Sequence, residues 1–304
     1  MAKLTYEELI KMVDYNKDDD KYGKIFIPND IFEKLRNEEK LTKKGERTST
    51  YVDVAYSYLY YVTFLYRNAK YGVMADSDSD VGRIKEVLGY SSTNKEINLI
   101  TGKNGVLEGM GLLKAEPFKK APITYSYNDG MVEFQYVEDV DYIKIKNKRK
   151  FVKYPVFALE RFGEDEYGYG TFNAKLDDAN IANTTELDFR VFARCMTNDN
   201  LGTSAFYLYA FLKWKSITSG KDSIEISHQK IMDSTGLTRG KLLQALDGLK
   251  KHNLIRCTPA PFVVGADDGE GASEYCVNEI ESYTEEEKSY STRKVIKAEV
   301  EDEK

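Results

Sequence analysis

Hydrophobic positions recur at helical spacing in residues 239–251, where four leucines form one stripe. These are Leu242, Leu243, Leu246 and Leu249. The stripe predicts an amphipathic helix that buries its leucines against the rest of the protein. Thr238 directly precedes this helix and offers its hydroxyl group to the free N–H groups of the first turn. A shorter helix is predicted before it, with Ser227 as its N-cap and Gly236 as the residue that ends it.

The opposite face of the predicted helix at 239–251 is polar and mostly basic. Its outward residues, together with the capping Thr238, are Arg239, Lys241, Gln244 and Lys251. Arginine and lysine suit guanine edges and phosphates, and glutamine suits adenine, so this face fits the major groove of DNA. A short helix, a turn and a longer amphipathic helix also occur in modules that bind only protein. DNA binding is therefore the leading hypothesis for this segment, and protein binding is the alternative.

The flanking segments supply further elements of a known DNA-binding arrangement. A helix is predicted at residues 203–217, a short strand at 223–226, and two more strands at 254–258 and 274–277. The order helix, strand, helix, helix, strand, wing, strand resembles that of the winged-helix superfamily, as does the Thr-Gly-Leu-Thr-Arg turn at 235–239. This resemblance implies that the second half of the chain is a winged-helix domain whose second helix of the pair reads DNA.

The same plan recurs in the first half of the sequence. Residues 51–70 have the pattern of a long aromatic helix, residues 79–88 that of a short one, and Gly89 stands where Gly236 stands in the second half. Matched positions keep a nearly constant separation, which predicts that one winged helix has been used twice. The resemblance to DNA-binding winged helices implies that the DNA contacts of the first copy are Thr93, Asn94, Lys95 and Asn98. We expect its reading helix to end early or to bend, because glycines interrupt it and each costs about 1 kcal/mol against alanine.

These patterns predict an α+β protein with two winged-helix domains in tandem. The predicted segments are an acidic N-terminal segment with a strand at 1–44, a first winged-helix domain with a basic hairpin at 45–156, a linker at 157–176, a second winged-helix domain at 177–280, and a charged, disordered tail at 281–304. A chain of 304 residues is long enough for two cores, because a single core stops growing near this length.

The strongest basic run lies at residues 142–154, which contain no acid. Its candidate phosphate contacts are Lys144, Lys146, Lys148, Arg149 and Lys150. Alternation with apolar residues predicts a β-hairpin, with a second arm at 151–154, that follows a phosphate backbone or enters the minor groove. A solvated edge strand protected by lysines is an equally good interpretation. The net charge of −6 and the acidic second wing at 265–274 argue against high intrinsic affinity for DNA.

Catalytic and metal chemistry receive little support from the sequence. The two histidines, His228 and His252, stand apart, and the chain contains no phosphate-binding loop, nucleophile elbow or zinc-protease motif. We therefore expect a protein that is not an enzyme and that carries no cofactor or metal. Its three cysteines form no CxxC pair, and no stretch of the sequence is long and apolar enough to span a membrane. Without a secretory signal, these features predict a cytoplasmic protein.

Two winged helices in a chain of this length, without an enzyme motif, resemble plasmid and phage replication initiators. This resemblance implies sequence-specific binding of double-stranded DNA through two recognition helices, each reading part of a repeated origin. A transcriptional regulator of a mobile element would use the same surface and is the first alternative. A tandem winged-helix protein that binds only protein is the second. Double-stranded DNA is the expected partner, and a homodimer or contacts with replication or transcription proteins are compatible with the sequence.

Overall fold

The computed structural model describes residues 4–16, 23–42, 50–75, 77–78, 80–128, 131–140, 151–159, 161–162, 171–172, 184–264 and 271–297. Within these ranges the protein combines helices with small sheets, so its class is α+β, as the sequence predicts. The helices are α1 (Tyr6–Met12), α2 (Asp30–Asn37), α3 (Val52–Arg67), α4 (Val81–Val87), α5 (Asn98–Thr101), α6 (Val106–Gly109), α7 (Val156–Leu159), α9 (Phe189–Thr197), α10 (Gly202–Ser219), α11 (His228–Thr235) and α12 (Arg239–Lys251). The strands are β1 (Lys24–Pro28), β2 (Leu113–Pro117), β3 (Pro122–Asn128), β4 (Met131–Tyr136), β5 (Phe151–Pro155), β6 (Arg161–Phe162), β7 (Thr171–Phe172), β8 (Thr184–Asp188), β9 (Ser223–Ile226), β10 (Ile255–Thr258), β11 (Phe262–Val264), β12 (Ser273–Val277) and β13 (Val295–Lys297).

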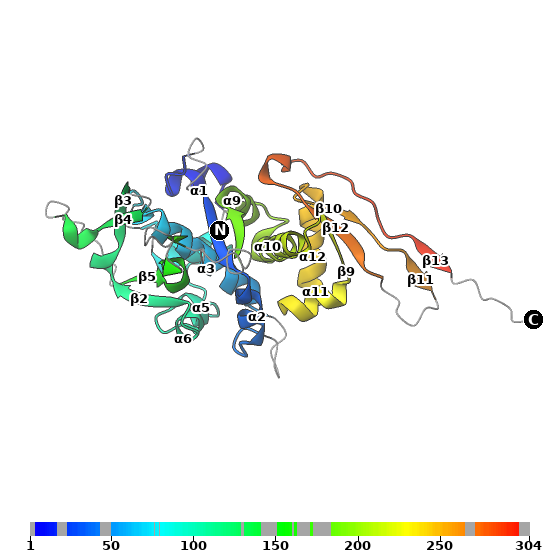
Figure 1. Ribbon diagram of the computed structural model, residues 1–304, viewed down its shortest axis with the longest axis horizontal. Coiled ribbons are helices and arrows are strands. Elements are labelled where there is room, and N and C mark those ends of the chain that lie inside the picture. Colours follow the sequence, from blue (N-terminus) through cyan, green and yellow to red (C-terminus); the bar gives the residue numbers. More distant parts are fainter. Residues whose placement is uncertain are drawn as a thin grey trace, which may run out of the picture.

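Two long helices, α3 and α10, pack against each other at the centre of the molecule (Figure 1). α3 is buried along almost its whole length because its sequence is apolar or aromatic on every side. Its tyrosines can be buried where the hydroxyl groups reach backbone carbonyls, as Tyr60 reaches the carbonyl oxygen of Leu187 at 3.1 Å. The ring of Phe206 in α10 lies 4.8 Å from that of Tyr60. One continuous core, with members from Leu4 to Tyr275, joins the two halves of the chain.

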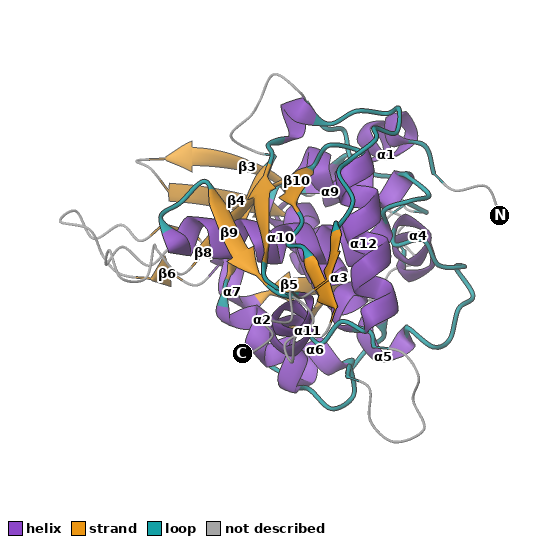
Figure 2. Ribbon diagram, turned by 90° about the vertical axis from the view of Figure 1, so that its right-hand side faces the viewer, coloured by secondary structure: helices purple, strands orange, loops and turns teal. Residues whose placement is uncertain are grey.

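The second half contains the predicted elements in the predicted order: α10, β9, α11, α12, β10 and β12. The strands form an antiparallel sheet in the order β10-β12-β9, beside α10 and α12 (Figure 2). Both predicted N-caps are confirmed, because the hydroxyl of Ser227 accepts from the Lys230 N–H and that of Thr238 accepts from the Lys241 N–H. Gly236 ends α11 in the left-handed conformation, with φ at 73°. Glycine adopts this conformation without strain because it has no Cβ atom.

The first half follows the predicted plan only in part. α3 and α4 are present, but the expected reading helix is broken into α5 and α6, of four residues each. Gly102 ends α5, and a Cβ atom at Gly105 would lie 2.8 Å from the carbonyl oxygen of Ile100, so the chain turns tightly between the two pieces. The described residues contain no strand between α3 and α4. β2 pairs with β5, and β3 pairs with β4 on either side of the predicted turn at 128–130.

The N-terminal segment is part of the core. β1, the strand predicted from the sequence KIFIP, pairs antiparallel with β8, so that Ile25 lies opposite Leu187. α1 packs on α9, and α2 packs on α3 and α11. Arg36 of α2 donates to the carbonyl oxygen of Asp233 in α11 at 2.6 Å. These contacts hold α2 against α11, beside the turn that leads into α12.

The tail that the sequence predicts to be disordered packs on the protein as far as residue 297. The 3-10 helix η4 (Ile280–Ser282) and the residues after it lie along α12, and β13 pairs in parallel with β11. Composition favoured disorder because the tail is charged and poor in large apolar residues, but backbone hydrogen bonds to the end of α12 fix it. Residues 298–304, most of the predicted linker (160, 163–170 and 173–176) and the wing loop at 265–270 lie outside the described residues.

Candidate nucleic-acid interface

The predicted leucine stripe holds α12 in place. Leu242, Leu246 and Leu249 are at most 3% exposed, and the helix packs closely on α10. Gly248 allows another close approach, because a Cβ atom there would lie 2.2 Å from the carbonyl oxygen of Asn200. The buried stripe fixes the rotation of the helix about its axis, and therefore determines which residues point outward.

The first two turns of α12 present four exposed residues. They are Arg239, Gly240, Leu243 and Gln244. The sequence assigns Leu243 to the buried stripe, but its exposed fraction is 42%, because positions 242, 246 and 249 already cover the buried arc. An arginine, an amide and an apolar side chain on one exposed face match the groups that read guanine, adenine and the thymine methyl. The first half of α12 is therefore the part of the predicted interface with the best chemistry for base reading.

Lys241 does not belong to this outward face, which corrects its predicted role as a DNA contact. Its Nζ lies 2.7 Å from Asp53 Oδ1 and 2.7 Å from the carbonyl oxygen of Thr50, at the start of α3. Thr203 and Ser204, at the start of α10, also donate to the Asp53 carboxylate, which is 1% exposed. A buried carboxylate needs such donors, and this one holds the lysine inside the protein. The charge of Lys241 therefore serves the contact between the two halves of the chain.

Lys251, near the end of α12, is also paired within the chain, so its predicted DNA contact is not available as it stands. Its Nζ lies 3.1 Å from Asp247 and 3.2 Å from Glu287 of the C-terminal tail. Hydrogen bonds to these two carboxylates raise the pKa of Lys251, so its ammonium group stays charged. The negative charges of Asp247 and Glu287 offset that positive charge. A DNA phosphate would have to replace Glu287 to reach this lysine.

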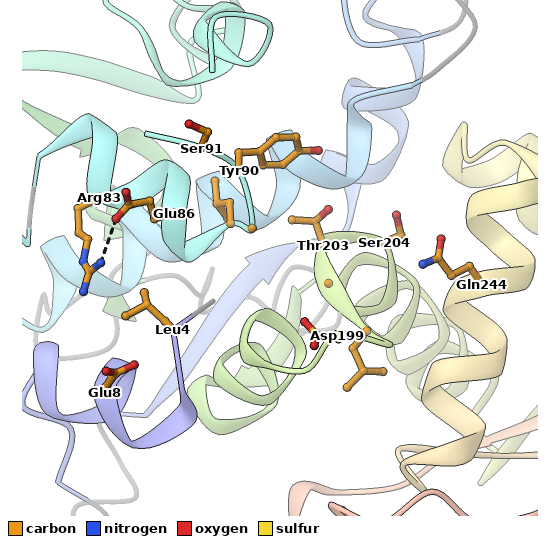
Figure 3. Close-up of a pocket in the computed structure, with 14 residues that line it drawn as sticks. Leu4, Glu8, Arg83, Glu86, Tyr90, Ser91, Asp199, Thr203, Ser204 and Gln244 are labelled. Carbon is orange, nitrogen blue, oxygen red and sulfur yellow. Dashed lines mark hydrogen bonds and ion pairs between the residues drawn. The ribbon is translucent and has the colours of Figure 1, made fainter. Parts of the chain in front are cut away.

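A cleft of about 980 Å³ opens between the two halves of the chain beside α12 (Figure 3). Gln244 faces it from α12, Thr203 from the start of α10, and Tyr90 from the turn after α4. Its charged lining residues are three acids and one arginine: Glu8, Glu86, Asp199 and Arg83. The arginine is paired with Glu86 at 2.9 Å. The cleft therefore carries net negative charge, which disfavours a phosphate backbone inside it.

The candidate contacts of the first half lie around the start of α5. Thr93, Lys95 and Asn98 are exposed and Asn94 is half-buried, and both asparagines use an oxygen atom within the protein. The backbone carbonyl of Asn94 and the side-chain oxygen of Asn98 accept hydrogen bonds from the Lys85 ammonium group, at 2.6 and 2.5 Å. Lys85 is 5% exposed, so these oxygens satisfy a buried charge. Asn94 and Asn98 thus tie α4 to the loop that follows it, and their predicted DNA contacts stay predictions.

Most of the basic run lies outside the described residues. Five of its residues, Lys144, Lys146, Lys148, Arg149 and Lys150, lie outside the described residues. The predicted second arm of the hairpin is β5, which pairs with β2, whereas the predicted first arm and tip lie outside the described residues. Lys153 of β5 is buried, pairs with Glu108 of α6 and donates to the carbonyl oxygen of Gly102 at 2.8 Å. The end of the basic run therefore holds β5 to the broken helix.

Asp53 and Lys85 are buried charges that the sequence reasoning missed. The available signal for Asp53 is local, because it is an acid in a segment that is otherwise apolar or aromatic, and a buried acid requires a partner. Nothing local identifies that partner, since 188 residues separate Lys241 from Asp53. For Lys85, Asn94 and Asn98 lie close enough in the sequence to act as hydrogen-bond acceptors. Their presence does not predict burial, because water would accept the same hydrogen bonds from an exposed lysine.

Comparison with protein-family models, with curated proteins and with solved structures finds no match to this chain. Among the described residues, no group of three or more His, Cys, Asp and Glu side chains could hold a metal ion. The described helices include none that combines the length and the apolar character needed to cross a membrane.

Proposed function

We propose that this chain binds double-stranded DNA through its second half, which we interpret as a winged-helix module. In support, α10, α11 and α12 lie beside a three-stranded sheet in the order β10-β12-β9, in which the last strand runs between the other two. A tight turn joins α11 to α12, and in helix-turn-helix proteins such a turn precedes the helix that enters the major groove. The exposed face at the start of α12 is the observation that carries the proposal.

Arg239, Leu243 and Gln244 are the residues to which we assign base reading. They lie in the first half of α12, which is the end that a helix-turn-helix directs at base edges. Arg239 suits the paired acceptors of guanine, Gln244 suits adenine, and Leu243 suits the thymine methyl group. A good bidentate base contact contributes about 1–3 kcal/mol of discrimination, so two such contacts and one apolar contact are enough for a short recognition sequence.

We assign the contacts to DNA bases to the second half of the chain alone. α5 and α6 have four residues each and do not form one helix that could enter a groove. Among DNA-binding proteins, our first proposal is a plasmid or phage replication initiator, and our second is a transcriptional regulator of a mobile element. Both act in the cytoplasm through the same surface, and both accommodate a homodimer or contacts with replication or transcription proteins.

Fluorescence anisotropy tests the proposal with labelled duplexes that are selected by the native chain from a random-sequence pool. We expect affinity to fall as salt rises, with a log–log slope that grows by about 0.9 for each neutralised phosphate. Arg239→Ala should weaken binding of the selected duplex by about 5- to 100-fold.

The matched control is Lys221→Ala, which also removes one positive charge. Lys221 is exposed and precedes β9 at the end of the sheet away from Ser227 and α11. Its substitution should change the affinity less than about twofold, since it lies far along the strand from the reading helix. If Arg239→Ala and Lys221→Ala bind the duplex equally well, α12 does not read DNA. If the native chain binds no duplex even at low salt, DNA is not the ligand.

The acidic cleft favours a second candidate function, a protein-interaction module. Its net negative lining would attract a basic protein segment and repel nucleic acid, and Lys241 and Lys251 are already balanced by carboxylates. This candidate predicts no affinity for duplexes at any salt concentration. The same anisotropy measurement therefore separates the two functions.

A further inference from the structure

We propose that residues 278–293, named here the C-terminal strap, compete with the DNA phosphate backbone for the outward side of α12. This inference rests on the proposed function, because the competition exists only if α12 binds a duplex. The strap leaves β12, crosses the C-terminal end of α12 and leads to β13, which pairs with β11 (Figure 1). The tail thus connects the end of α12 to β11.

Backbone hydrogen bonds hold the strap against the last turn of α12. The Thr284 N–H donates to the carbonyl oxygen of His252 at 3.2 Å, and the Lys288 N–H donates to that of Lys251 at 2.8 Å. The last carbonyl groups of a helix have no partner within the helix, so donors from outside stabilise them. The His252 ring also stacks on Tyr283, with ring centroids 5.7 Å apart. The strap is therefore a C-terminal cap of α12 built from a distant part of the chain.

Side chains of the strap cover the outward side of the second half of α12. Glu287 lies 3.2 Å from the Lys251 ammonium group, and the Tyr290 hydroxyl donates to Asp247. The ammonium group of Lys250 lies 3.9 Å from the centre of the Tyr290 ring, in a cation–π contact. Both lysines at the end of α12 are thus occupied by the strap. These are the cations that the proposed DNA complex would turn toward phosphates.

Carboxylates of the strap form ion pairs with bases of α9, α10 and α12, and only the pair with Lys251 lies on the proposed reading helix. Glu279, Glu281, Glu285 and Glu287 pair with Lys213, Arg190, Arg194 and Lys251, respectively, at 2.9–3.2 Å. The side chains of these acids are 47–71% exposed, so each pair contributes at most about 1 kcal/mol and can exchange for another anion. A duplex offers a denser row of negative charges and gains entropy from released counterions. The ion pairs of the strap can therefore exchange for another anion, while hydrogen bonds from Asn198, Asn200 and Asn253 to the strap must also break for it to leave α12.

Hydrogen exchange on the full native chain tests the displacement directly. The amide groups of Thr284 and Lys288 lose their acceptors when the strap leaves α12. We expect saturating amounts of the selected duplex to raise their exchange rates at least tenfold. If both amides stay as protected in the DNA complex as in the free protein, the strap and the duplex do not compete and the proposal is overturned.

Glu287→Gln supplies a second measurement, because it removes the anion that balances Lys251. We expect the affinity for the duplex to rise at least threefold while the log–log salt slope stays the same, because Lys251 contacts the same phosphate in both complexes once the strap has left α12. Glu286→Gln is the matched control, since it makes the same charge change one residue away. Glu286 is exposed, and within the described residues no ion-pair partner is assigned to it. Equal affinities of the two variants would overturn the proposal.

Failure of this proposal and failure of the proposed function give different results. If neither the native chain nor Glu287→Gln binds a duplex, DNA binding is wrong and the strap proposal falls with it. If the native chain binds the selected duplex while the strap amides remain protected, DNA binding stands and the strap is a structural cap only. If binding and strap release occur together, both proposals are supported.

Discussion

Lys241 Nζ lies 2.7 Å from Asp53 Oδ1, and this contact joins α12 of the second half to the first turn of α3 in the first half. The Asp53 side chain is 1% exposed and that of Lys241 is 25% exposed, so the carboxylate is buried and the lysine partly so. The Thr203 hydroxyl adds a hydrogen bond to the same carboxylate at 3.2 Å, from the start of α10. Three helices therefore meet at one acid, which ties the proposed reading helix to the shared core.

Replacing Lys241 by alanine leaves the Asp53 carboxylate buried without its cation. We expect Lys241→Ala to lower the free energy of unfolding by about 3 kcal/mol, near the low end for a broken buried pair, because Thr203 continues to donate. Urea unfolding measures this loss. Lys230→Ala, which removes an exposed lysine from α11, is the control and should change the free energy by less than about 0.5 kcal/mol. Equal losses in the two variants would show that the pair contributes nothing to stability.

Two glycines of α12 should respond to alanine in opposite directions. A Cβ atom at Gly248 would lie 2.2 Å from the carbonyl oxygen of Asn200, whereas one at Gly240 has no atom within 4 Å. Gly248→Ala should therefore destabilise the protein by about 1–3 kcal/mol through overpacking. Gly240→Ala should stabilise it by up to about 1 kcal/mol through helix propensity. Thermal unfolding distinguishes the cases, and a shift of Tm in the same direction for both would contradict the packing described for α12.

The sequence predicted the α11 and α12 region well because the signals there are local. Ser227, Gly236 and Thr238 act on atoms only a few residues away, so their pattern fixes the ends of the two helices whatever surrounds them. The turn at 128–130 is local in the same sense, and β3 and β4 pair around it as predicted. The break between α5 and α6 was also foreseeable, since the cost of glycine in a helix belongs to the glycine itself.

Relationships between distant segments were not predictable from one sequence. The periodicity of a single helix places Lys241 opposite the leucine stripe and thus indicates solvent, but α3 brings Asp53 to that position from 188 residues away. β1 likewise pairs with β8, which lies far along the chain. The sequence of one strand does not identify the strand with which it pairs. The strap has a composition that favours disorder, yet the free carbonyl groups at the end of α12 give it partners.

The reactivity of Cys257 measures access to the cavity next to the strap. It lines a cavity of about 270 Å³ with Leu243, Tyr275 and Tyr290, and burial raises the pKa of its thiol. We expect iodoacetamide to modify Cys257 at pH 8 about tenfold more slowly in the native protein than in urea, because less thiolate forms and access is limited. Peptide mapping by mass spectrometry separates Cys257 from the other two cysteines. Equal rates in native and unfolded protein would contradict the partial burial of Cys257 beside the strap.

The Asp247 and Tyr290 contact gives the strap a defined pH range. Partial burial alone would raise the pKa of Asp247, but the hydrogen bonds from Tyr290 and Lys251 outweigh it and hold this pKa below its ordinary value of 3.8. The hydrogen bond to Asp247, with a smaller effect of burial, raises the pKa of Tyr290 above its ordinary value of 10.0. The two shifts have opposite directions, so they limit the stabilisation from opposite ends of the pH scale.

The lowered Asp247 pKa means that the contact stabilises the fold fully above pH 3.8, and that the stabilisation is lost as pH falls through the lower folded value. The raised Tyr290 pKa means full stabilisation below pH 10.0, which is lost as pH rises through the higher folded value. Tyr290→Phe should therefore lower Tm by about 1–2 °C from about pH 5 to about pH 9, and by less at either extreme. Calorimetry across this range measures the difference in Tm between the native protein and Tyr290→Phe. In an Asp247→Asn background, the effect of Tyr290→Phe on Tm should no longer change as pH falls into the acid range. A difference between native and Tyr290→Phe that stays constant into strong acid would show that the carboxylate of Asp247 does not hold the strap.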